Sequence, residues 1–72
     1  MTHERYAAID AAAVRLWKLT RELDRLRGDL VVTFWVAAKC HAMIRDGTAN
    51  DPEQVTELAD ALERRLSQER AA

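Results

Sequence analysis

Cys40 and His41 are the side chains best suited to chemistry, and they are neighbours in the sequence. A thiolate and an imidazole can bind zinc or form a nucleophile and its base. However, a structural zinc site needs about four ligands, and the chain has one cysteine and, besides His41, only His3. Adjacent helical residues also point about 100° apart, so this pair converges poorly. We therefore predict no metal site, no cofactor and no catalytic cysteine.

A second set of candidate residues is basic and could contact an anion or nucleic-acid phosphates. Its main members are Arg15, Lys18, Arg21 and Arg25, and Arg27 could also contact phosphate. The net charge of −1 opposes this interpretation, because nucleic-acid-binding domains usually carry a basic excess. In a helix-turn-helix over residues 37–66, the reading helix would begin with Asp51, Glu53 and Glu57, which would repel phosphate. Pairing of Glu22 with Lys18 and Arg25 would instead make this a solvated helix face.

A small helical-bundle enzyme is a third interpretation, in which Arg15 and Lys18 would bind an anionic substrate. The sequence has no glycine-rich phosphate loop, no carboxylate pair on an apolar face and no triad-like set. The tripeptide Arg27-Gly28-Asp29 matches an integrin motif. All three residues are better explained by a helix boundary: a helix end, a glycine after it and the cap of the next helix. We therefore favour a protein that is not an enzyme.

Large apolar side chains point to association. Hydrophobic residues make up 49% of the 72 residues, yet 13 of these 35 are alanine, so the chain has little bulk for a core. A small single core supplies only a few kcal/mol, and oligomerisation is a common remedy. Tryptophan is also enriched at binding hot spots. We predict that an interface includes Trp17, Leu30, Phe34, Trp35 and Met43.

The first element that positions these residues is a helix over about residues 3–27, with Thr2 as a candidate cap. Apolar residues recur at intervals of three and four, which is a seam on one helical face: Ile9, Ala12, Leu16, Leu19, Leu23 and Leu26. Trp17 lies off this seam, on a face with Ala13 and Thr20.

The second element covers about residues 29–45. Residues 30–36 are β-branched and aromatic, which favours a strand, but the chain holds no second candidate strand to pair with it. We predict a helix capped by Asp29 that is apolar nearly all round, hence buried. Two adjoining stripes carry this character, Leu30/Phe34/Ala37/Ile44 and Val31/Trp35/Ala38/Ala42. One long helix through Gly28 and an intermolecular strand over 30–36 remain as alternatives.

The third element is a helix over about residues 52–69. Asp51 and Pro52 are typical of a helix cap and first position. One face carries Val55, Leu58, Ala59, Leu62 and Leu66. Asp60 and Arg64 are spaced to form an ion pair along the helix.

Charge is distributed unevenly behind the small net value. Residues 15–27 hold five basic and two acidic groups, whereas residues 46–63 hold six acidic groups and no base. This pattern fits ordinary solvated faces, or an acidic third helix that faces a basic surface on the first helix or on a partner.

The sequence thus predicts an all-α, three-helix antiparallel bundle in a single domain over residues 1–72, completed by dimerisation. Residues 30–38 are the longest nearly uncharged stretch, far short of the about 20 residues of a membrane span. No secretory signal fits residues 1–13, so we expect a cytoplasmic protein. The expected function is a non-enzymatic protein–protein interaction module, a homodimeric accessory or regulatory factor. The alternative is a nucleic-acid-associated regulator that uses the basic first helix.

Overall fold

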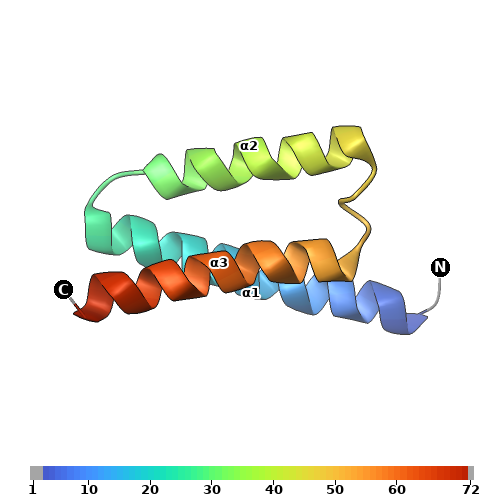
Figure 1. The fold of residues 1–72 in the computed structure, drawn as a ribbon, viewed down its shortest axis with the longest axis horizontal. Helices are drawn as coiled ribbons and strands as arrows, with labels where there is room; N and C mark the ends of the chain where they lie inside the picture. Colours follow the sequence, from blue (N-terminus) through green and yellow to red (C-terminus); the bar gives the residue numbers. More distant parts are fainter. Residues whose placement is uncertain (1–2, 72) are drawn as a thin grey trace.

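A computed structural model describes residues 3–71 of the chain and contains three helices. They are α1 (His3–Arg27), α2 (Val31–Asp46) and α3 (Pro52–Ala71). α1 and α3 run in the same direction, and α2 runs opposite to both (Figure 1). The predicted all-α bundle is confirmed, and the strand over residues 30–36 is not formed, because α2 covers residues 31–36. The suggested cap at Thr2 lies outside the described residues.

The tightest packing in the bundle joins α1 to α3. Both helices contribute a buried alanine, Ala12 and Ala59, and alanine side chains let helix backbones approach closely. Larger side chains fill the rest of this core: Leu16, Leu23, Val55, Leu62 and Leu66. The predicted apolar face of α3 is therefore confirmed, with Leu58 packed against its buried members.

The predicted seam of α1 is correct for most of its length and wrong at its end. Leu26 is 51% exposed, whereas Thr20 and Asp24 are buried. The cause is that α1 packs against two helices, so its buried surface turns towards α2 near its C-terminus. The buried Thr20 hydroxyl donates a hydrogen bond to the Leu16 carbonyl oxygen of the same helix, 2.8 Å away.

α2 is attached far less closely than α3. It contributes one fully buried residue, Val36, and the half-buried Val32, Cys40 and Met43 pack beside it. No Cα atom of α2 lies within 8 Å of a Cα atom of α3. The prediction that α2 would be buried is therefore wrong for the single chain.

The turn between α1 and α2 confirms the predicted break at Gly28. Gly28 has φ = +76°, a left-handed conformation that glycine adopts without steric cost. Asp29 is not the N-cap as predicted, since Leu30 occupies that position. The Asp29 carboxylate still accepts a hydrogen bond from the Val31 N–H at 3.1 Å.

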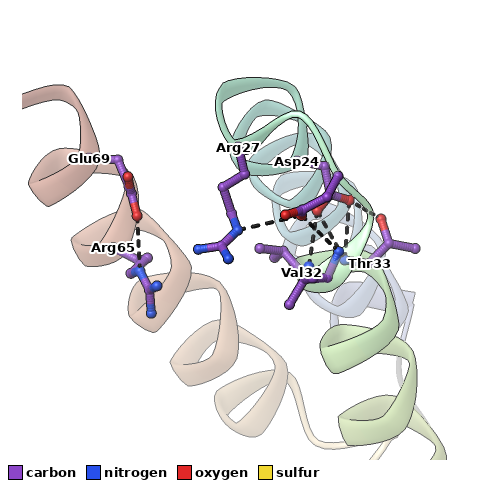
Figure 2. A network of polar contacts seen from close by, with 8 residues as sticks. Asp24, Arg27, Val32, Thr33, Arg65 and Glu69 are labelled. Carbon is purple, nitrogen blue, oxygen red and sulfur yellow. Dashed lines mark hydrogen bonds and ion pairs between the residues drawn. The ribbon is translucent and has the colours of Figure 1, made fainter.

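The main cap of α2 comes from α1. Asp24, only 7% exposed, accepts hydrogen bonds from the N–H groups of Val32 at 3.0 Å and Thr33 at 3.2 Å. It also accepts from the Thr33 hydroxyl (Figure 2). A carboxylate at a helix N-terminus satisfies free N–H donors and favours the helix dipole. Asp24 therefore fixes where α2 begins relative to α1.

The start of α3 is as predicted: Asp51 accepts a hydrogen bond from the Glu53 N–H at 3.0 Å, and Pro52 begins the helix. The predicted Asp60–Arg64 pair is wrong. Asp60 instead pairs with Arg15 of α1 at 2.7 Å, and Glu63 pairs with the same guanidinium at 2.7 Å. The acidic side of α3 thus faces a basic residue of α1.

Candidate interaction surface

Most of the apolar surface of α2 is exposed. The stripe Leu30, Phe34, Ala37 and Ile44, here called the outer face, carries the largest exposure: Phe34 69%, Ile44 68% and Leu30 60%. The second stripe, Val31, Trp35, Ala38 and Ala42, is here called the groove face, and Trp35 is 44% exposed. Because the buried row of α2 runs through Val32, Val36, Cys40 and Met43, both predicted stripes lie beside it.

Helical geometry explains how one short helix presents two apolar faces. Each face repeats at intervals of four and three residues, so its members line up along the helix. Between Val31 and Arg45 the charged side chains are only Lys39 and Arg45, both basic. The Lys39 ammonium lies 5.4 Å from the centre of the Trp35 ring, a cation–π distance. An exposed apolar surface of this kind is a candidate for contact with another molecule.

Trp17 adds to this surface from α1. It is 40% exposed and lines a hollow of about 140 Å³ together with Cys40, Met43 and Ile44 of α2. Met43 also packs against the core of its own chain. Among the five predicted interface residues, Trp17, Leu30, Phe34 and Trp35 are therefore exposed and Met43 is half-buried.

The groove face borders a larger depression between α2 and α3. This groove has a volume of about 410 Å³. Its floor is apolar, because Leu23 and Leu62 are buried, and Trp35 forms part of one wall. Arg27, Arg64 and Arg65 also line it.

The four predicted anion-binding residues do not converge on one site. Arg15 is engaged by Asp60 and Glu63; its hydrogen bond to Asp60 raises the pKa of the guanidinium. Arg25 pairs with Glu22, whose pKa is lowered mainly by that hydrogen bond. Within residues 3–71, no carboxylate oxygen lies within 4.0 Å of the charged groups of Lys18 or Arg21, and both residues are exposed.

Cys40 and His41 differ in environment. Cys40 is half-buried and free, and its burial raises the pKa of the thiol. His41 is exposed. In the described part of the chain, no three side chains of the His, Cys, Asp or Glu type gather as a metal site would require. A raised thiol pKa leaves less of the reactive thiolate at neutral pH.

Two features of this region carried no usable signal in the sequence. By its place in the sequence Asp24 is one of the two acidic groups among the bases of residues 15–27, although its carboxylate caps α2. Arg64 was paired with Asp60 along the helix, although it lines the groove. Both roles depend on which helices meet, and local spacing does not specify that.

No protein-family model, curated protein or solved structure matches the chain. None of the helices within residues 3–71 has the length and apolar character needed to cross a bilayer.

Proposed function

We propose that this protein is a non-enzymatic protein–protein interaction module that works as a homodimer and serves a partner protein as an accessory or regulatory factor. The observation that supports it is the outer face of α2, where Leu30, Phe34 and Ile44 are each more than half exposed. A small domain that leaves its largest apolar residues in water gains stability by covering them. A cytoplasmic location is part of the proposal, since the only thiol is free.

The dimer we propose pairs α2 with α2 of a second copy, antiparallel, across a two-fold axis at Ala37. In such a pairing Leu30 lies beside the partner's Ile44, and Asp29 lies beside the partner's Arg45. Ala37 meets the partner's Ala37, and two small side chains at the crossing point let the helices approach closely. The sequence of α2 is therefore suited to the self-complementary contact that a two-fold axis requires.

Sedimentation velocity tests the dimer. We expect the wild-type protein to sediment as a dimer at tens of micromolar, and Phe34→Glu to sediment as a monomer because it places a charge in the apolar contact. Val14→Glu is the matched control, since Val14 is 55% exposed but lies on α1. It should leave the dimer intact. A wild-type monomer at that concentration contradicts the proposal.

Cysteine crosslinking tests the orientation. In a Cys40→Ser background, Ala37→Cys should form a disulfide-linked dimer under mild oxidation, because a bridge requires Cα atoms about 4.4–6.8 Å apart. Leu30→Cys alone should not crosslink in the antiparallel pairing, but should do so in a parallel one. Leu30→Cys combined with Ile44→Cys should crosslink in the antiparallel pairing. Efficient crosslinking of Leu30→Cys alone would rule out the antiparallel arrangement.

The alternative function, a nucleic-acid-associated regulator, is supported by Lys18 and Arg21, which have no carboxylate within 4.0 Å in residues 3–71. It predicts salt-sensitive binding that Arg21→Ala combined with Arg25→Ala weakens. If the wild-type protein shifts neither duplex DNA nor single-stranded RNA in a gel at low salt, this alternative is removed.

A further inference from the structure

The groove between α2 and α3 lies on a different side of α2 from the outer face. Its buried floor is formed by Leu23 and Leu62, and the more exposed Val31 and Trp35 stand at its α2 wall. A homodimer built on the outer face therefore leaves the groove open. The groove also holds the second exposed tryptophan, which the dimer contact does not use.

Three arginines, Arg27, Arg64 and Arg65, line this groove, and no acidic residue lines it. Arg27 makes its closest contact with Asp29 through Nε at 3.5 Å, and Arg65 with Glu69 through Nε at 3.4 Å. Figure 2 shows the terminal nitrogens of Arg65 pointing away from the Glu69 carboxylate, and the Arg27 contact is likewise made through Nε rather than through a terminal nitrogen. Arg64 has no carboxylate within 4.0 Å among the described residues.

The terminal nitrogens of a guanidinium form a fork that binds a carboxylate through two hydrogen bonds. Arg27 comes from α1, while Arg64 and Arg65 come from α3, so two of the helices around the groove supply its positive charge. A ligand that satisfies them needs an apolar body for the floor and more than one carboxylate at its edges. A single-headed amphiphile such as a fatty acid carries only one.

We propose that this groove binds an acidic amphipathic helix of a partner protein. Such a helix inserts apolar side chains spaced three and four residues apart over the floor, in the helix-in-groove mode. Glutamate or aspartate side chains flanking the apolar row meet the Arg27, Arg64 and Arg65 forks. The inference rests on the proposed interaction function and names the chemistry of the partner.

Fluorescence anisotropy of a labelled synthetic peptide tests the inference. The probe is a capped helical peptide with leucine at positions i, i+3, i+4 and i+7 and glutamate at the flanking positions. We expect the wild-type protein to bind it with a Kd below about 1 mM. Arg64→Glu combined with Arg65→Glu should weaken binding about tenfold or more, since like charges then face each other.

Lys18→Glu combined with Arg21→Glu is the matched control, because it makes the same charge change on α1, away from the groove. It should change the Kd by less than about twofold, because neither Lys18 nor Arg21 lines the groove. A peptide with lysine in place of glutamate should bind at least about tenfold more weakly. Circular dichroism of each variant shows that the helices are kept.

Three results would overturn the inference: no binding of the acidic peptide, equal binding of the lysine peptide, or equal weakening by the two double variants. Displacement of the peptide by a single-stranded oligonucleotide at equal concentration would assign the groove to nucleic acid instead. Sedimentation separates this outcome from the dimer proposal. If the wild-type protein is a dimer but does not bind the peptide, only the dimer proposal stands. If it is a monomer that binds the acidic peptide selectively, only the groove proposal stands.

Discussion

The α1–α3 pair and α2 differ in how closely they are packed and in how apolar they are. α1 and α3 share most of the buried side chains and are joined by Arg15 to Asp60 and Glu63. α2 contributes Val36 as its only buried residue and is fixed at its start by Asp24. Yet α2 is the most apolar of the three helices. The apolar surface is therefore concentrated where the single chain covers it least.

This contrast separates what holds the monomer together from what is left for partners. Apolar area contributes to stability only when it leaves water, so the outer face, whose large residues are 60–69% exposed, adds little to the isolated chain. The same residues contribute as soon as a second surface covers them. Substitutions in the two regions should then differ in which measurement they affect, the free energy of unfolding or the association.

The largest expected effect on stability is at Leu23. Leu23→Ala removes a side chain that is fully buried and should lower the free energy of unfolding by about 2–5 kcal/mol. Leu30→Ala makes the same chemical change at a residue 60% exposed and should shift it by less than about 0.5 kcal/mol in dilute, monomeric protein. Urea unfolding measured at one low protein concentration makes the comparison.

At high protein concentration the difference between the two losses in free energy of unfolding should become smaller, because dimerisation stabilises the folded state by mass action. Leu30→Ala should then lose the part of this stabilisation that its side chain contributes. Equal effects of the two substitutions at low concentration would show that α2 is packed in the single chain as firmly as α1 is.

A smaller effect is expected at Asp24. Asp24→Ala leaves the N–H groups of Val32 and Thr33 without their acceptor and should cost about 1–2 kcal/mol, as for the loss of a helix cap. Hydrogen exchange should quicken in α2 and stay unchanged in α3. Asp24→Asn, which keeps an acceptor oxygen, should restore most of the protection. Uniformly faster exchange in all three helices would contradict a cap that acts on α2 alone.

The sequence was sufficient to predict the three helices, because the features that mark them are local. Gly28 and the Asp51-Pro52 pair mark boundaries through backbone preferences of single residues, and both boundaries are confirmed. The apolar face of α3 followed from its periodicity alone. The two apolar stripes of α2 also followed from periodicity, but the prediction that they are buried is wrong, since Phe34 is 69% and Trp35 44% exposed.

The errors involve residues whose role depends on which helices meet. Asp24 caps a helix eight residues further on, which requires the chain to fold back first. Asp60 pairs with Arg15 rather than with Arg64, because the packing of α1 against α3 places the Arg15 guanidinium beside it. That Arg27 and Arg65 line one groove could not be predicted for the same reason, since they come from different helices.

The smallest expected effect concerns Cys40, which reports how firmly α2 is held. Burial raises the pKa of this thiol, so the folded protein keeps its proton to higher pH than the unfolded chain does. The contribution of Cys40 to the free energy of unfolding is therefore complete below the ordinary thiol pKa and is lost as pH rises through the raised value. Alkylation by iodoacetamide should accordingly be severalfold slower in the native protein than in urea, because the thiolate is the reacting species.

Asp24→Ala should accelerate this alkylation, since loosening α2 exposes the half-buried thiol, whereas Leu30→Ala should leave it unchanged in dilute protein. Alkylation rates measured across pH separate the two causes: a lowered apparent pKa indicates a thiol that has become solvated, and an unchanged pKa with a higher rate indicates brief opening of α2. If the native wild-type protein is alkylated as fast as the unfolded chain, α2 is already detached in solution. The loose attachment of α2 to α1 would then be an equilibrium between docked and open states rather than a fixed packing.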